Sequence, residues 1–237
     1  MQTQTEITLR PSRLPDWVRA FFSSADWADH DGVCLRPALA TSHGIAPAAL
    51  TLCQQTHGAG VALVAPQQVG RGAQSNATRL PNADALITAE PHAALCILTA
   101  DCVPILLCDK VQRVVAAIHS GWRGTVANIV QATVDQMVSQ FGTDPINVVA
   151  AIGPHIHVGS YTVGPEVAEA LGAEHTEIDT LGRLHANLTS AVVCQLKSCG
   201  IPDIEVVGPD TGAIGSLWPS YRRERTVRRL ASVIMLQ

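Results

Sequence analysis

The sequence predicts an α/β protein of the layered, α+β kind, with mixed β-sheets sandwiched by helices in a single compact domain over residues 1–237. Two observations predict this class. Short apolar runs rich in β-branched residues alternate with segments of helical period, as in layered folds. Of the 237 residues, 47% are hydrophobic and 15% are charged, which suffices for a full core and excludes extensive disorder.

The strands become readable only after the first fifth of the chain. Residues 1–50 are the poorly defined part, because prolines interrupt them and no period of 2 or 3.6 lasts, so we expect loops with one or two edge strands. Residues 71–81 are rich in turn-forming residues. We expect buried strands at 83–88, 94–99, 103–108, 114–118 and 146–152, and further strands at 61–64, 204–207 and 230–236.

Three helices are expected between these strands. Apolar residues recur every three to four positions from Thr125 to Val138, and Gly142 follows where a helix-ending glycine is typical. Two further helices are expected at 167–171 and 188–196, the second ending near Gly200. We find no internal repeat and no linker that would divide the chain.

Charge and cysteine content exclude several function classes. A net charge of −4 gives no general attraction to nucleic acid or anionic membranes, so neither is an expected partner. No apolar run reaches the roughly 20 residues of a transmembrane helix, and residues 1–10 lack the apolar core of a signal peptide. Seven cysteines without CxxC spacing fit reduced thiols in the cytoplasm. The oligomeric state is not predicted.

Three strand ends are the candidate site. At each, an apolar strand gives way to polar, reactive residues, which is where layered folds place function. His57, Cys102 and His119 lie at these ends and could meet. Two imidazoles and a thiolate suit zinc, with a fourth position open to water, and they also suit copper. Spacing alone leaves open that Cys102 is a buried apolar side chain and that the histidines cap turns.

Charged residues beside these ends are further candidates. Asp101 could orient a metal-bound imidazole, hold a substrate hydroxyl or cap a turn. Arg123 lies between two glycines before a helix, which suits an anion, although a surface salt bridge would also explain it. Residues 222–229 include five arginines, which form either a solvated strand face or, through Arg222 and Arg223, a phosphate site.

Several sequence blocks together resemble a known family. They read QTHG at 55–58, ADAL at 83–86, TADCVPILL at 99–107 and AIHSGWRGT at 117–125. These blocks resemble the signatures of the polyphenol-oxidase or laccase-domain family, which includes bacterial purine nucleoside phosphorylases and peptidoglycan editing factors. Residues 151–154, 161–164 and 220–223 are similar to its later blocks, so the match covers about residues 52–236.

The resemblance implies a function and a set of site residues. It implies one zinc per chain, held by His57, Cys102 and His119 in a pocket of strand ends. The implied reactions are phosphorolysis of adenosine, inosine, guanosine or methylthioadenosine with inorganic phosphate, and adenosine deamination. Asp101, Cys102 and Arg123 are then the expected catalytic residues. The expected substrate and phosphate ligands are Arg123, Arg222 and Arg223.

Departures from the family pattern keep other functions open. The usual cysteines of the fourth block are absent and two histidines, His155 and His157, appear there; Asp210 replaces another cysteine, and Arg225 replaces the glycine of RRDG. One alternative is a metal-free amide hydrolase with a cysteine nucleophile and a histidine base. A copper-dependent oxidase and a non-enzymatic module of cell-wall quality control are the others. Multicopper chemistry needs more HxH pairs than the one at 155–157.

Overall fold

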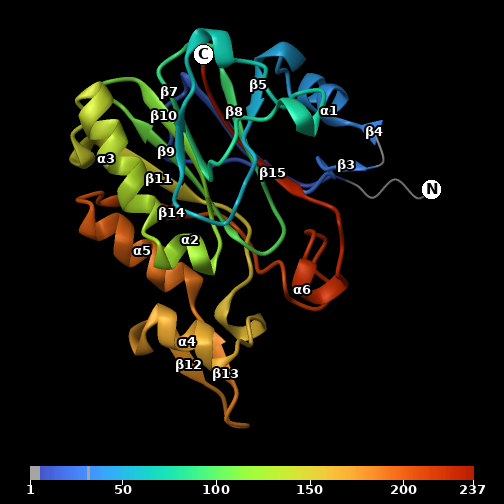
Figure 1. Ribbon diagram of the computed structural model, residues 1–237, viewed down its shortest axis with the longest axis vertical. Coiled ribbons are helices and arrows are strands. Elements are labelled where there is room, and N and C mark those ends of the chain that lie inside the picture. Colours follow the sequence, from blue (N-terminus) through green and yellow to red (C-terminus); the bar gives the residue numbers. More distant parts are fainter. Residues whose placement is uncertain (1–5, 31–32) are drawn as a thin grey trace.

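Two packed β-sheets form the centre of the protein, whose residues 6–30 and 33–237 are described by a computed structural model (Figure 1). One sheet has the order β1 (Thr8–Leu9), β2 (Val18–Ser23), β15 (Leu230–Leu236), β8 (Ala94–Thr99), β5 (Leu50–Leu52). The other has the order β14 (Asp203–Val206), β11 (Val148–Ile152), β9 (Val103–Asp109), β10 (Val114–Ser120), β7 (Ala85–Thr88), β6 (Val61–Leu63). Both sheets are mixed, because β5–β8, β6–β7 and β11–β14 pair in parallel and the other pairs are antiparallel.

Helices cover the outer faces of both sheets, which gives four layers. Helix α1 (Arg36–Ser42) covers the five-stranded sheet, and α3 (Ile129–Phe141) and α5 (Leu188–Ser198) cover the six-stranded one (Figure 1). Alternate side chains of one strand therefore enter different cores. In β8, Leu95 and Ile97 pack between the sheets while Cys96 packs toward α1. In β9, Leu106 packs between the sheets while Ile105 packs toward α3 and α5. The predicted fold class is confirmed.

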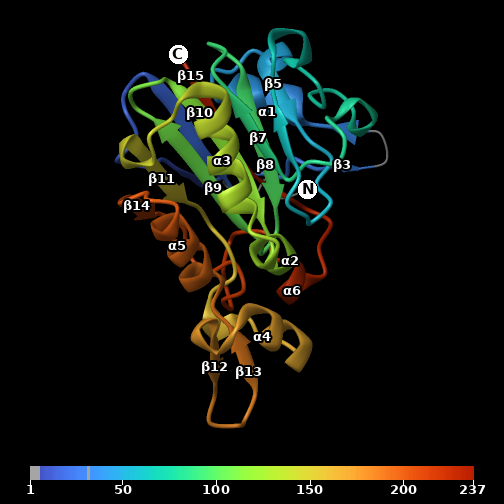
Figure 2. The same ribbon diagram turned by 60° about the vertical axis from the view of Figure 1, so that its left-hand side comes forward.

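Smaller elements lie around this sandwich. They are α2 (Trp122–Val126), α4 (Pro165–Leu171), α6 (Tyr221–Glu224), the pair β3 (Asp29–His30) and β4 (Val33–Cys34), and the pair β12 (Thr176–Ile178) and β13 (Leu184–Ala186). Helix α4 and the β12–β13 pair form a lobe at one end of the molecule in both views (Figures 1 and 2). In the part of the chain that the structure describes, every helix is too short or too polar to cross a membrane.

The helix expected from Thr125 to Val138 is wrong in one respect, because the structure divides it into α2 and α3. Asn128 between them has a φ of 57°, a left-handed conformation that interrupts a right-handed helix. Gly142 ends α3 with a φ of 68°, which confirms the expected terminal glycine. The strand expected from Ile146 begins at Val148, after a short 3₁₀ turn.

The expectation for residues 1–50 is only partly right. Strand β2 lies inside its sheet, between β1 and β15, rather than at an edge. Its partner β15 is at the other end of the chain, so no local pattern announces the pairing. Helix α1 is also unexpected, since Pro37 lies in its first turn, where proline is tolerated rather than disruptive. Residues 1–5 and 31–32, which belong to the same prediction and partly to the signal-peptide prediction, lie outside the described residues.

Candidate metal centre

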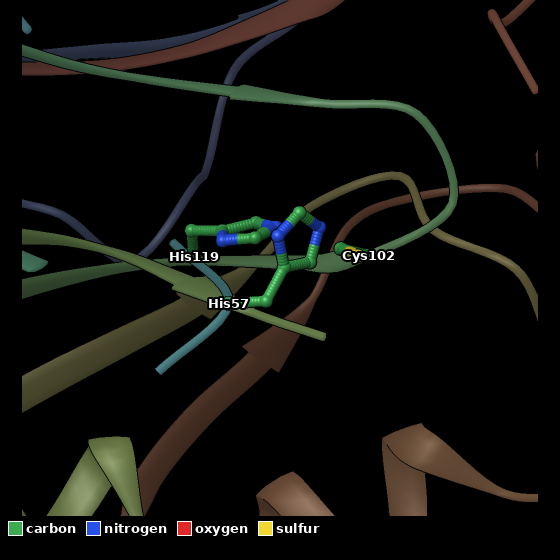
Figure 3. A group of neighbouring side chains, drawn as sticks. All are labelled: His57, Cys102 and His119. Carbon is green, nitrogen blue, oxygen red and sulfur yellow. The ribbon is translucent and has the colours of Figure 1, made fainter. Parts of the chain in front are cut away.

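Three side chains from separate segments meet near two connections at which the chain crosses from one sheet to the other. His57 lies in the connection from β5 to β6, Cys102 in the short turn from β8 to β9, and His119 near the end of β10. Their ligand atoms lie within 4.8 Å of one another, and Figure 3 shows the side chains gathered together. The two imidazole rings meet edge to face, with centroids 4.8 Å apart. The structure thus brings together the three residues that the sequence singled out.

This donor set fits a divalent metal ion. Two imidazole nitrogens and one thiolate are typical zinc ligands that leave a fourth position open, and copper accepts the same types. Gly121 makes room for the cluster, because a Cβ at this position would lie 2.8 Å from Sγ of Cys102 and 3.5 Å from Cδ2 of His57. The backbone after β10 can approach the thiol only as glycine. The cluster could therefore hold a metal ion.

The electrostatics of the cluster favour a thiolate. Burial alone would raise the pKa of Cys102, but the charge of His119 and hydrogen bonds from both histidines outweigh it and lower the pKa to about 6. Against its own burial, His119 has its pKa raised to about 9 by the Cys102 thiolate and by Asp84. Cys102 is therefore ionised at neutral pH, which is the form that binds metal or attacks a substrate.

Asp84 is a buried carboxylate that the sequence analysis did not single out. Its Oδ1 accepts hydrogen bonds from Nδ1 of His119 at 2.8 Å and from the backbone N–H of His57 at 2.9 Å. Its Oδ2 accepts from the Thr56 hydroxyl at 2.9 Å and from the N–H groups of Thr56 and Gly58 at 3.1 and 2.8 Å. Burial opposes ionisation, but these bonds hold the pKa of Asp84 well below its usual range. Its signal in the sequence is an aspartate heading an apolar strand, where a charge is costly unless paired.

Asp101 uses both carboxylate oxygens within the chain. Oδ1 accepts from the Thr211 hydroxyl at 2.7 Å, and Oδ2 accepts from the backbone N–H of Arg222 at 2.6 Å. Its backbone is left-handed, with a φ of 87°, and its carbonyl accepts from the N–H of Ile156 at 3.0 Å. These contacts fix the turn that presents Cys102. The catalytic role of Asp101 stays a prediction, and the geometry favours a positioning role.

A cavity of about 680 Å³ opens over the three candidate ligands. Its lining includes the aromatic side chains of Trp122, Tyr161 and Tyr221. Tyr161, which the sequence analysis quoted only as part of a motif, also lines a small adjoining pocket together with Cys102. Burial, followed by the nearby Cys102 thiolate, raises the pKa of Tyr161 to about 12, so its phenol keeps a proton to donate. The volume is in the usual range for small-molecule sites.

Two of the candidate arginines line this cavity. Arg123 is exposed and lies over the ring of Trp122, with its guanidinium carbon 4.3 Å from the ring centroid. Arg222 lies over the ring of Tyr161 at 5.1 Å and donates to the carbonyl of Thr162 at 2.5 Å. Both combine a positive charge with an aromatic surface beside the cluster.

Arg223 has a different environment. Its guanidinium donates to the carbonyls of Thr211 and Ala213, both at 2.7 Å, and of Trp218 at 3.0 Å, and it pairs with Glu224. Arg223, in α6, therefore holds the loop of residues 211–218 in place against that helix. Its predicted phosphate contact has less support than those of the other two arginines.

The HxH pair, His155 and His157, does not join the cluster of the three candidate ligands among the described residues. His155 is buried, and its ring nitrogens contact the carbonyl of Gly153 at 2.8 Å and the hydroxyl of Thr189 at 2.6 Å. Burial lowers the pKa of His155 to about 4, so it is neutral. The ring of His157 lies 4.8 Å from that of His155. Within the described residues, neither belongs to a cluster of three metal-ligating side chains.

The fold and the cluster define an α+β sandwich protein with a candidate metal centre at the connections that join its two sheets. The model of the family described as multi-copper polyphenol oxidoreductase laccase matches residues 31–237, and the chain belongs to this family. The resemblance drawn from the sequence blocks is therefore confirmed.

Curated relatives and solved structures similar to this chain include the following three. A purine nucleoside phosphorylase of Bacteroides thetaiotaomicron is 40% identical over 167 residues, which are 68% of this chain but only 62% of that protein. Adenosine deaminase RL5, from an unknown prokaryotic organism, is 33% identical over 179 residues, 73% of this chain and 68% of that protein. The crystal structure of YlmD from Geobacillus stearothermophilus has a TM-score of 0.88 at 27% identity, covering 98% of this chain and 100% of that one.

Proposed function

We propose that this protein is a zinc-dependent purine nucleoside phosphorylase that also deaminates adenosine. The proposed substrates are adenosine, inosine, guanosine or methylthioadenosine with inorganic phosphate. One observation carries the proposal: the His57–Cys102–His119 cluster faces a cavity whose walls offer both guanidinium groups and aromatic faces. The two named relatives support it, because one is a purine nucleoside phosphorylase and the other an adenosine deaminase.

Each part of the cavity has a proposed task. The three ligands would hold the zinc, which when bound supplies a Lewis acid beside the substrate. Phosphate is a compact anion, and the guanidinium groups of Arg123 and Arg222 supply the charge and the paired N–H groups that it needs. Trp122 and Tyr161 offer faces on which a purine can stack. Only phosphorolysis uses an anion as a substrate, so the loss of an arginine should impair phosphorolysis more than deamination.

Zinc is proposed rather than copper because multicopper chemistry needs several metal sites. Among the described residues the HxH pair at 155–157 forms no second metal cluster, since the His155 ring contacts a carbonyl and a hydroxyl instead. The family description includes copper, so metal analysis of purified protein decides between them. The cytoplasmic location expected from the cysteines stays a prediction, supported by the free thiols of the six cysteines whose side chains are described.

The test is a product assay with and without phosphate. Adenosine is incubated with the purified protein, and the products are separated by chromatography. Adenine and ribose 1-phosphate that form only with phosphate would support phosphorolysis, and inosine that forms without phosphate would support deamination. No product from any purine nucleoside, with zinc bound, would contradict the proposal and favour the non-enzymatic module.

Arg123→Ala sharpens this test. We expect it to reduce phosphorolysis at least tenfold and deamination much less, because only the first reaction binds phosphate. Arg113→Ala is the matched control, since Arg113 also stacks on a tryptophan, Trp17, at 4.8 Å but does not line the cavity. Equal loss of both reactions in Arg123→Ala would mean that this arginine is structural.

One observation favours a second candidate, the metal-free amide hydrolase. Cys102, His119 and Asp84 form a chain of thiolate, imidazole and carboxylate like that of cysteine hydrolases. His57 has no role in such a chain but is the third ligand of a metal site. A chelator separates the candidates, because it would abolish a zinc-dependent activity and leave the hydrolase active.

A further inference from the structure

We propose that Asp84 is the positioning residue of the metal centre, because its single carboxylate orients both histidine ligands. The inference rests on the metal centre of the proposed function. It assigns a role to a fully buried residue that does not itself line the cavity.

Asp84 sets the tautomer of His119. A carboxylate can only accept hydrogen bonds, so Nδ1 of His119, 2.8 Å from Oδ1 of Asp84, must carry the proton that it donates. The lone pair of a neutral ring then lies on Nε2, the nitrogen left for the cluster. Asp84 and His119 are both buried, with 0% and 2% of their surfaces exposed, so water does not compete for this bond.

Asp84 also binds the backbone turn that carries His57. Its φ of 61° is left-handed, which costs a non-glycine residue about 1 kcal/mol. The consecutive N–H groups of Thr56, His57 and Gly58 converge on the Asp84 carboxylate, as in the backbone nests that bind anions. The carboxylate thus holds the turn in the conformation that presents the His57 ring to the cluster.

A neutral amide cannot do both tasks. In Asp84→Asn, one oxygen and one NH₂ group would face five donors. If the NH₂ group faces His119, Nδ1 must accept, and the proton moves to Nε2, where it blocks the metal. If the NH₂ group faces the turn instead, the N–H groups of Thr56 and Gly58 lose their acceptor. Either orientation weakens one ligand.

The experiment measures zinc affinity rather than activity, by competition with a chromophoric chelator, together with the rise in Tm on zinc addition. We expect Asp84→Asn to bind zinc about 10- to 100-fold more weakly, the range seen for partners behind metal ligands. Asp109→Asn is the matched control. Asp109 is equally buried, and its Oδ1 accepts from the N–H groups of Val111 and Gln112 at 2.8 and 3.0 Å, at the far end of β9. It should lose stability but bind zinc as the unmodified protein does.

The outcomes separate this inference from the function it rests on. Unchanged zinc affinity in Asp84→Asn would overturn the positioning role alone. Failure of the unmodified protein and of Asp109→Asn to bind zinc would overturn the metal centre and the positioning role together. If Asp84→Asn does not fold, Thr56→Val decides, because it removes one hydroxyl that donates to Asp84 at 2.9 Å. We expect about a threefold loss of zinc affinity, and no loss would overturn the proposal.

Discussion

Gly121→Ala tests whether close packing sets the position of the Cys102 sulfur. The backbone of Gly121 is extended, with φ −78° and ψ 174°, which alanine adopts without strain. The added Cβ would lie 2.8 Å from Sγ of Cys102. The substitution therefore acts on the cluster through contact alone.

The size of the effect follows from that distance. Non-bonded heavy atoms reach their optimum at about 3.5 Å or more, so the sulfur must recede by about 0.7 Å. Functional groups need placement within about 0.5 Å, and an error of about 1 Å can cost about 100-fold in rate. We expect zinc affinity and phosphorolysis to fall between about 10- and 100-fold. Overall stability should change by less than about 1 kcal/mol, because the backbone accepts alanine.

Chelator competition and the adenosine assay measure the two losses. Gly159→Ala is the matched control, because an added Cβ there meets no atom within 4 Å and the residue follows the nearby segment of His157. The control should keep its zinc and its rate. If Gly121→Ala had the same zinc affinity and the same phosphorolysis rate as Gly159→Ala, close contact with residue 121 would not set the position of the Cys102 sulfur.

Three further predictions concern the same region. The pKa of His119 is raised to about 9, so zinc must displace a proton from this ring when it binds below that pH. Zinc affinity should therefore rise about tenfold per pH unit from pH 7 to 9 and then level off. A chelator titration measures the affinity at each pH, and a flat profile would contradict the prediction. Alkylation of Cys102, monitored by peptide mass spectrometry, should be slow when zinc is bound and fast after chelation. The exposed Cys194 is the control and should react at the same rate with and without zinc. Rapid alkylation of Cys102 with zinc bound would favour the metal-free hydrolase. Arg223→Ala should lower stability by about 1–3 kcal/mol in a denaturant titration and leave the KM for phosphate unchanged, and a large rise in that KM would restore its predicted phosphate contact.

The sequence predicted the layers well because their signal is local. The runs that became β8 and β9 are apolar on both faces, and both faces are covered. The position of β2 could not be predicted, since its neighbour β15 is at the other end of the chain. The break at Asn128 was missed because the apolar period continues across it, and only its φ reveals the interruption.

The three candidate ligands could be predicted from the sequence, but the residues that support them could not. His57, Cys102 and His119 stand out because polar residues end apolar strands, and the structure gathers them. Their supports depend on distant contacts: Asp101 meets Thr211, 110 residues later in the chain. The partners of Asp84, a turn and a histidine on another strand, have no signature in its own segment.

The central claim is that the cluster holds a zinc ion on which purine nucleoside phosphorolysis depends. The most direct measurement is to strip the metal with a chelator, titrate zinc back and follow adenosine phosphorolysis against bound zinc. We predict that activity rises in proportion to bound zinc and stops rising at about one zinc per chain. Activity that persists in the stripped protein, or that stays absent when zinc is bound at one per chain, would contradict the claim.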